Sequence, residues 1–506
     1  MEQKNTTSTP PEKPSGDNRA MSDNQQSEGG TPPENQTMQD FTPGGANQLS
    51  NLLYLSLGAG CIILSIAIMY AILSKFFKKP VSETIAGKKR KAIFIGGALI
   101  LTAGLGAVCY FCVPLIGGSQ FANVQMPDMG SMPGESGDSG NSEATGATTI
   151  ESNQTIDGES LSSITADESV ILVQNGGNLT LTDVKIAKTG NSTNTENSEF
   201  YGINAAILVT KNSTAIIEGA EISTAAQGAN AVFATGENAK ITIKNSTITS
   251  TGESSARGLD ATYGGHIEAD NVKITTSGGS CATLATDRGE GTVIAKNSTL
   301  TTNGAGSPLI YSTGDISAIN STGTANGSQI AVIEGKNSAT IESSTFSATG
   351  AGNRGDVDRA AVMIYQSMSG DASEGTGTFT AKNSTLTLNA TDESVPFFFI
   401  TNTDAVINLE NTTLDYSGKI LLSAQGTSEW GTSGQNGGQV AFNVAKTDLT
   451  GAITMDDLSS VILNLDAASS WTLSADSYLT ALNNADANNS NIHKNGYKLY
   501  VNGVEI

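Results

Sequence analysis

A short sequence that recurs at a nearly fixed interval limits the possible folds of this chain more than any other feature. The tetrapeptide Lys-Asn-Ser-Thr begins at Lys211, Lys244, Lys296 and Lys382, with a near copy at Lys336. Nine longer segments, such as KITIKNSTI and TVIAKNSTL, align around a common turn position, and their successive spacings are 36, 26, 26, 26, 23, 23, 40 and 28 residues. A usual period in the low to middle twenties is that of one coil of a parallel β-solenoid. The aligned turn positions are Asp183, Gly219, Asn245, Asn271, Asn297, Asn320, Ser343, Asn383 and Asn411.

The alternation within a coil predicts which side chains point inward. Ile241 and Ile243 alternate with polar residues, and Asn245 follows at the turn. Stacked coils would repeat every residue type at about 4.8 Å, so inward-facing Asn side chains would hydrogen-bond along the stack. Roughly a dozen coils between residues 178 and 467 would form a rod of about 50–60 Å. The predicted turn ladder consists of Asn245, Asn271, Asn297, Asn320, Asn383 and Asn411.

The composition supports a thin, repetitive β-structure. The chain has 56 glycines, and only 5% of its residues are aromatic and 15% charged, which is unusual for a globular enzyme. Cys281 is the one cysteine after residue 118, so no disulfide framework can hold this part of the chain. Residues 118–506 carry 17 basic and 41 acidic residues, a net charge of 17 − 41 = −24. Because such a charge repels nucleic acid, we expect no nucleic-acid partner.

The aligned turns, the Thr/Ser-rich strands and the closing segment ASSWTLSADSYLTALNNADANNSNIHKNGYKLYVNGVEI resemble a known family. They are similar to right-handed parallel β-helix, adhesin-like surface proteins of anaerobic Gram-positive gut bacteria and their relatives. The resemblance covers roughly residues 164–506. It implies display at the cell surface and contact with glycans or with the surface proteins of neighbouring cells.

Two uncharged apolar segments, 52–73 and 92–116, are each long enough to cross a hydrocarbon layer of about 30 Å as a helix. The loop between them is strongly basic and is therefore predicted to be cytoplasmic. Two spans then place the N-terminus and the solenoid outside the cell, in a multi-pass plasma-membrane protein. Cys109 and Cys112, in the second apolar segment, are interpreted as packing residues rather than a metal or redox pair.

The chain thus divides into seven predicted parts. The final part should cover the open end of the solenoid, with Trp471 and Leu473 packed on the last coil. The parts are a disordered acidic tail (1–50), a first transmembrane helix (51–74), a basic cytoplasmic loop (75–91), a second transmembrane helix (92–117), a flexible spacer with the start of a cap (118–163), the parallel β-helix (164–467) and a C-terminal cap (468–506).

Some β-helix proteins cleave acidic polysaccharides with carboxylates and basic residues that converge from adjacent coils. Two acidic and basic clusters lie where loops are expected, and solvated ion pairs are their favoured interpretation. The alternative is catalysis by Asp356, Asp358 and Arg354. No metal or cofactor is predicted, and His266 and His493 are isolated. The clusters are Arg354, Asp356, Asp358 and Arg359, followed by Asp371 and Glu374, and separately Asp287, Arg288 and Glu290.

Three coils are enlarged by insertions at residues 190–202, 352–375 and 426–438. Insertions at a similar phase of the repeat should emerge on one side of the rod, where loops on a rigid scaffold commonly bind ligands. We expect Tyr201, Arg354, Asp356 and Trp430 to contribute to a ligand-binding surface rather than to one pocket. The favoured function is non-catalytic adhesion or glycan recognition by a membrane-anchored surface protein. The alternative is a membrane-tethered lyase or hydrolase of uronic-acid polymers.

Overall fold

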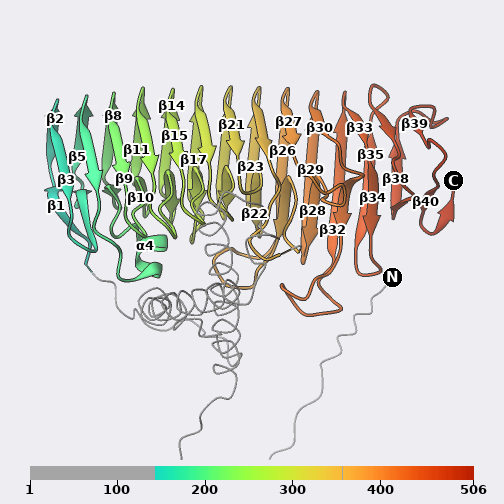
Figure 1. Cartoon of the computed structure of the whole chain (residues 1–506), viewed down its shortest axis with the longest axis horizontal. Helices are drawn as coiled ribbons and strands as arrows, with labels where there is room; N and C mark the ends of the chain where they lie inside the picture. The colour runs from blue at the N-terminus through green and yellow to red at the C-terminus, as the bar shows by residue number, and fades with distance from the viewer. Residues whose placement is uncertain (1–142, 356) are drawn as a thin grey trace, which may run out of the picture. The chain divides into compact units, whose positions relative to one another are not determined.

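The computed structural model describes residues 143–355 and 357–506, and this part of the chain is almost entirely parallel β-strand (Figure 1). Most turns of the chain contribute one strand to each of three long sheets, which we name A, B and C. Each strand inside a long sheet pairs with its equivalents in the preceding and following coils, and nearly all of these pairs are free of register shifts. The predicted parallel β-solenoid is confirmed, and 11 of the 13 strands of sheet B lie between residues 178 and 467, where roughly a dozen coils were expected.

Sheet A consists of β1 (Thr145–Ile150), β4 (Glu168–Val173), β7 (Ile207–Val209), β10 (Val232–Thr235), β13 (Leu259–Thr262), β16 (Leu284–Thr286), β19 (Ile310–Ser312), β22 (Ala331–Glu334), β25 (Val362–Tyr365), β28 (Phe398–Thr401), β31 (Ile420–Ala424) and β34 (Ala452–Met455). Sheet B consists of β2 (Asn153–Asp157), β5 (Asn178–Thr182), β8 (Thr214–Glu218), β11 (Lys240–Lys244), β14 (His266–Asp270), β17 (Thr292–Lys296), β20 (Asp315–Ile319), β23 (Ser338–Glu342), β26 (Thr376–Lys382), β29 (Thr403–Glu410), β32 (Gly438–Ala445), β35 (Ser460–Leu465) and β38 (Ala481–Asn484). Sheet C consists of β3 (Ser160–Ser163), β6 (Lys185–Lys188), β9 (Glu221–Thr224), β12 (Thr247–Ser250), β15 (Lys273–Thr276), β18 (Thr299–Thr302), β21 (Thr322–Ala325), β24 (Thr345–Ala348), β27 (Thr385–Leu388) and β30 (Thr413–Tyr416).

The solenoid strands begin at Thr145, ahead of the predicted start at residue 164, because the segment expected to form a cap makes the first coil, β1 to β3. At the other end, Trp471 and Leu473 are fully buried in the core, and the Trp471 indole N–H donates to the Gly451 carbonyl at 2.9 Å. Two small sheets complete this end, and in the second of them β41 pairs antiparallel to β40. They consist of β33 (Asp448–Thr450), β36 (Ser470–Thr472) and β39 (Ile492–His493), and of β37 (Ser477–Leu479), β40 (Leu499–Val501) and β41 (Val504–Glu505).

The predicted tail, both predicted membrane spans, the basic loop and most of the spacer fall before residue 143, outside the described residues. Within the described residues the helix is α4 (Thr195–Tyr201), which has seven residues and is capped by the Asn194 side chain. No helix in this region is both long and apolar enough to span a membrane.

All nine predicted turn positions lie at one corner, between sheets B and C, and each has a left-handed backbone with φ between 47° and 69°. Asn tolerates this conformation better than other side-chain-bearing residues, which explains its recurrence. The prediction that the Asn side chains face inward was wrong. Asn245 and Asn297 are exposed, because the left-handed turn points its side chain to solvent. The outer ladder is in segments, with Asn271 donating to Asn245 at 2.6 Å and Asn411 donating to Asn383 at 2.8 Å.

The inward residue is the Ser that follows the Asn, so the tetrapeptide encodes both sides of the corner. Ser298 is buried, and its hydroxyl accepts the Val272 N–H at 3.1 Å while donating to the Lys296 carbonyl at 2.7 Å. The Ser298 N–H in turn donates to the Ser321 hydroxyl at 3.0 Å. This inner serine ladder satisfies buried backbone groups that the corner removes from the sheets.

We expect Ser298→Ala to lower the free energy of unfolding by about 1–3 kcal/mol, because the buried Val272 N–H would lose its acceptor. The matched control is Thr299→Ser at the next, exposed residue, which should change the free energy by less than about 0.5 kcal/mol. Urea unfolding measures both variants. Equal effects of the two changes would contradict a structural role for the inner serine.

Candidate binding pocket

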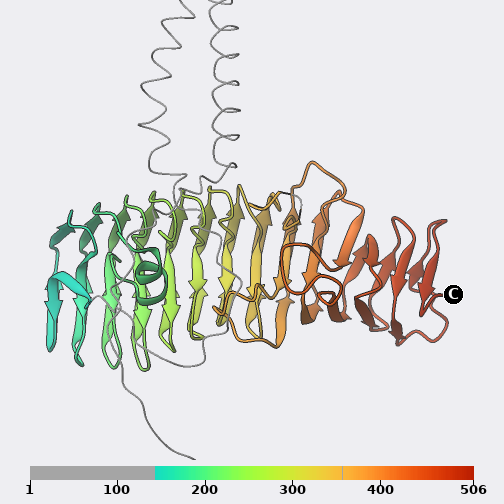
Figure 2. The same ribbon diagram turned by 90° about the horizontal axis from the view of Figure 1, so that it is seen from below.

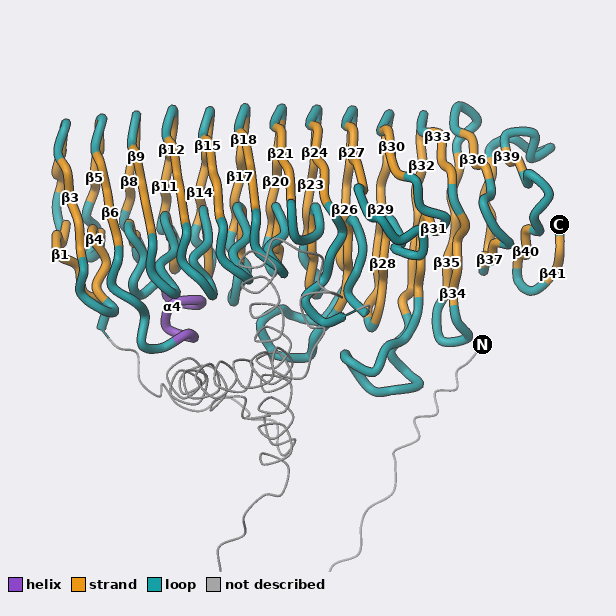
Figure 3. The backbone as a smooth tube through the Cα atoms, viewed as in Figure 1, coloured by secondary structure: helices purple, strands orange, loops and turns teal. Residues whose placement is uncertain are grey.

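The three insertions cover the outer face of sheet A, and Figure 3 shows the purple helix α4 and the long teal loops on the lower side of the stack. Residues 190–202 enter between sheets C and A, residues 352–375 flank β25, and residues 426–438 link β31 to β32. Figure 2 looks onto the side that carries α4. The expectation that the insertions share one side of the solenoid agrees with this placement.

One row of outward-facing side chains on sheet A explains why a pocket forms beneath the insertions that cover this sheet. At its N-terminal end, Leu208 and Phe233 are fully buried in an apolar cluster beneath the first insertion. Towards the other end, Val332, Met363 and Phe399 pack with Trp430 of the third insertion. Two apolar clusters therefore cover the ends of the row. Between them, in strict register, the row contains Asp260, Ala285 and Tyr311.

The gap between the two apolar clusters is a pocket of about 330 Å³, close to the lower limit of about 300 Å³ for ligand pockets. Its lining comes from all three insertions and from the coils beneath them. Its polar and aromatic lining includes Glu199, Arg257, Asp287, Tyr311, Arg354, Asp358, Tyr365, Asp371 and Trp430.

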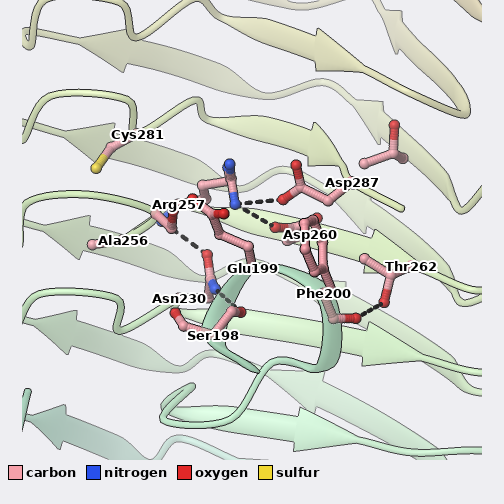
Figure 4. A network of polar contacts seen from close by, with 12 residues as sticks. Ser198, Glu199, Phe200, Asn230, Ala256, Arg257, Asp260, Thr262, Cys281 and Asp287 are labelled. Atoms are coloured by element: carbon pink, nitrogen blue, oxygen red, sulfur yellow. Dashed lines mark hydrogen bonds and ion pairs between the residues drawn. The ribbon is translucent and has the colours of Figure 1, made fainter. Parts of the chain in front are cut away.

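A buried charge cluster lies beside the pocket (Figure 4). One guanidinium nitrogen of Arg257 contacts Asp260 at 3.3 Å and also contacts Asp287, and all three side chains are at least 93% buried. Burial raises the pKa of Asp260 to about 6 against the opposing effect of Arg257, and burial likewise raises the pKa of Asp287 well above its usual value. The two carboxyls also contact each other, so one proton between them removes their mutual repulsion.

Helix α4 is joined to this cluster by buried hydrogen bonds. The Asn230 amide accepts the Arg257 N–H at 3.0 Å and donates to the Ser198 carbonyl at 3.1 Å. Thr262 donates to the Phe200 carbonyl at 2.8 Å, and the Ser255 hydroxyl donates to Glu199. These contacts fix the first insertion on the sheet and hold Glu199 at the pocket.

The second insertion is joined to the first through Arg288. Its guanidinium donates to Asp371 at 2.6 and 3.2 Å and lies 3.8 Å from the centre of the Phe200 ring. Asp371 is separated from Arg288 by 83 residues, so two clusters that the sequence placed apart meet in the structure. Glu290, from the same predicted cluster as Arg288, instead pairs with Lys336 at 2.8 Å.

Two tyrosines of the pocket are already hydrogen-bonded. Tyr311 and Tyr365 both donate to one carboxylate oxygen of the buried Glu334, at 3.2 and 3.0 Å, and Ser367 contacts the other oxygen. Burial raises the pKa of both tyrosines well above the usual value. The hydroxyls are therefore fixed as neutral donors to Glu334, while their rings remain as apolar wall.

The predicted site residues are distributed as follows. Arg354 and Trp430 line the pocket, with the Arg354 guanidinium 5.9 Å from the Trp430 ring centre. Tyr201 lies outside the lining and stacks on Tyr263 at 5.5 Å, although its neighbour Phe200 is in the lining. Asp356 is outside the described residues. The expectation of a dispersed surface therefore differs from the structure, since residues of all three insertions line one pocket.

The remaining acidic and histidine candidates have local roles. Asp358 is buried, and its carboxylate accepts the N–H groups of Asn353 at 2.8 Å and Arg354 at 3.1 Å, which closes the loop. Arg359 pairs with Asp392 at 3.0 Å. Glu374 is exposed, and so is His493, whereas the half-buried His266 contacts Glu268. Among the described residues, no group of three or more His, Cys, Asp or Glu is placed to hold a metal ion.

Sequence reasoning missed Arg257, Asp260, Glu334 and the two tyrosines. The signal for Asp260 was present in the segment ARGLDATY, where a strand of otherwise apolar and small residues contains a charged residue three positions after an arginine. Its register neighbours Phe233 and Ala285 are apolar, which marks the position as covered rather than solvated. A search against family models, curated proteins and solved structures finds no match to this chain.

We expect the stability of the protein to report on the Asp260 carboxyl. Its pKa is raised from 3.8 to about 6 on folding, so its contribution to stability is full below about pH 4 and is lost as the pH rises through 6. Relative to Asp260→Asn, the wild type should lose about 2 kcal/mol of unfolding free energy between about pH 4 and pH 7. Urea unfolding across this range measures the difference. Parallel pH profiles would show that Asp260 does not take up a proton on folding.

Proposed function

We propose that the solenoid recognises a short saccharide in the pocket on the outer face of sheet A, without catalysis. The observation that carries the proposal is the meeting of three insertions, from coils far apart in the sequence, over one pocket with aromatic and hydrogen-bonding walls. Saccharide sites combine apolar faces, which contact the pyranose ring, with a few fixed polar groups. Trp430, Tyr311 and Tyr365 supply the apolar faces, and Glu199 and Arg354 supply polar groups at the two sides.

The charge of the lining favours a neutral or amino-bearing sugar. Four carboxyl groups, from Glu199, Asp287, Asp358 and Asp371, face two guanidinium groups, from Arg257 and Arg354. One shared proton on the buried pair still leaves an excess of negative charge. Because like charges repel in a partly desolvated pocket, this lining disfavours uronic acids.

The contacts of the carboxyls support binding rather than bond cleavage. A glycosidase needs two carboxyls that flank the scissile bond. Here Asp260 and Asp287 contact each other and also share the Arg257 guanidinium, which leaves no room for a scissile bond between them. Asp358 and Asp371 are bound by a loop backbone and by Arg288. Glu199 also accepts a hydrogen bond, from Ser255.

We expect a glycan array probed with the purified protein to detect neutral or amino-sugar oligosaccharides. Arg354→Ala should weaken this binding about tenfold, because the exposed guanidinium is lost from the rim of the pocket. Arg359→Ala, in the same insertion but outside the lining, is the matched control and should leave binding unchanged. Preferred binding of uronic-acid oligosaccharides, or equal effects of the two variants, would contradict the proposal.

A second candidate function is cleavage of polysaccharides by hydrolysis or by a lyase reaction. It is favoured by the raised pKa values of Asp260 and Asp287, since carboxyls with raised pKa values are typical of general acids. Incubating the protein with the bound oligosaccharides and with uronic-acid polymers, with and without Ca²⁺, separates the candidates. Binding alone predicts no new reducing or unsaturated ends. Release of such ends that Asp287→Asn abolishes would replace recognition by catalysis.

We also propose that the protein is an adhesin-like surface protein whose two apolar segments, 52–73 and 92–116, anchor it in the membrane with the solenoid outside. Protease added to intact cells should then release the solenoid and leave the basic segment 75–91 protected. An epitope placed in each segment reports its cleavage. Protection of the solenoid in intact cells, with cleavage only after lysis, would refute this orientation.

A further inference from the structure

The C-terminal part of sheet B carries a second set of ordered polar groups, on a different sheet from the pocket. Asn408, Asn443, Asn464 and Asn483 occupy the same outward position in four consecutive strands, β29, β32, β35 and β38. Each of the last three donates its amide N–H to the side-chain oxygen of the Asn before it, at 2.8, 2.7 and 2.7 Å. Asn408 donates to the Thr380 hydroxyl at 3.2 Å. We name these four asparagines the amide row.

Coil stacking alone does not account for the amide row. The same outward position in the eight coils before Thr380 is occupied by residues of different size, polarity and charge, and those coils stack in the same register. Asn appears at this position only in the four coils of the row, within the part of the chain that the structure describes. The preceding residues are Thr155, Thr180, Ile216, Thr242, Glu268, Ile294, Ser317 and Thr340.

The amide row lines a groove of about 860 Å³ that has three charged side chains in its lining, those of Lys382, Glu410 and Asp466. Lys382 pairs with Glu410 at 3.1 Å. Asp466 accepts the backbone N–H groups of Lys446 and Ala468, each at 3.2 Å. The solenoid as a whole is strongly acidic, so a groove lined mainly by amides, with one ion pair and one hydrogen-bonded carboxylate, is a local departure that fits an uncharged ligand.

Each inner amide of the row retains free hydrogen-bonding capacity. An Asn side chain has two N–H donors and an oxygen with two lone pairs, and the ladder uses one of each. One N–H and one lone pair per coil are thus left for a ligand. The next outward row, two residues earlier in each strand, is apolar and partly exposed, with Val406, Ala441 and Ile462. Donors, acceptors and apolar surface therefore alternate across the strands and repeat along the stack.

We propose that the amide row binds an uncharged polysaccharide chain that lies along the stack, across the strands. Successive sugar hydroxyls would bond to successive amides, and the apolar row would contact pyranose faces. Five positions from Thr380 to Asn483, spaced by about 4.8 Å, span about 19 Å, which is enough for several sugar residues. The row is therefore suited to an extended chain, unlike the pocket on sheet A.

The test is affinity electrophoresis of the full chain in gels that contain hydroxyethyl cellulose, galactomannan or polygalacturonate. We expect at least one neutral polymer to retard the wild type and polygalacturonate not to do so. The double variant Asn443→Thr/Asn464→Thr should bind the neutral polymer about tenfold more weakly, because the amide donors and acceptors are lost. Thr occupies this position in β11 and β23, so the fold accommodates it.

The control is Thr242→Val, at the equivalent outward position of β11 but outside the groove. This variant should bind the neutral polymer as the wild type does. If the double variant fails to fold, Asn483→Ala at the exposed last position should still weaken retardation. Retardation by no neutral polymer, or by polygalacturonate equally, would overturn the proposal. Unchanged retardation of the double variant would also overturn it. So would sedimentation that shows self-association of the wild type and none of the double variant. Arg354→Ala leaves this groove intact, so a failure here is separable from a failure at the pocket.

Discussion

The structure depends on the in-register hydrogen bonding of each coil to the next. A single coil of 23 or 26 residues buries too little apolar surface to be stable, and its strands gain partners only from neighbouring coils. Because the coils are in register, each position of the coil is copied along the stack at a spacing of about 4.8 Å. The inner serine ladder, the exposed Asn corner and the amide row are all consequences of this copying. Neutral, self-complementary side chains suit it best, because like charges stacked at this spacing repel.

The candidate pocket arises where the copying is interrupted. In one row of sheet A, large apolar residues give way to Asp260 and then to Ala285 before Tyr311. Asp260 introduces a buried charge, which pairs with Arg257. Ala285 leaves space that a larger side chain would fill. The insertions close the two sides with separate apolar clusters. The candidate pocket is thus a local exception on a regular scaffold.

Much of the scaffold could be predicted from the sequence, since the period and the turn positions are properties of local segments. The predicted inward orientation of the Asn245 side chain was wrong, because the residue that points inward is the next one in the chain. Periodicity locates a corner but does not say which of its residues turns inward. The first coil was missed because its turn is at Gly158 and lacks the recurrent motif. The pocket was beyond prediction, since Arg288 and Asp371 meet only when the insertions fold back over intervening coils.

The direction of the coil-to-coil hydrogen bonds also determines how the solenoid responds to force. These bonds lie along the stack axis, so tension between the two ends loads the coil-to-coil interfaces in series, and the weakest interface yields first. A coil such as the 26 residues from Asn245 to Asn271 occupies about 4.8 Å of the axis but extends to about 90 Å once released. Under load, the stack therefore lengthens in steps and can extend far beyond its folded length. Each detached coil relaxes the tension on the coils that remain.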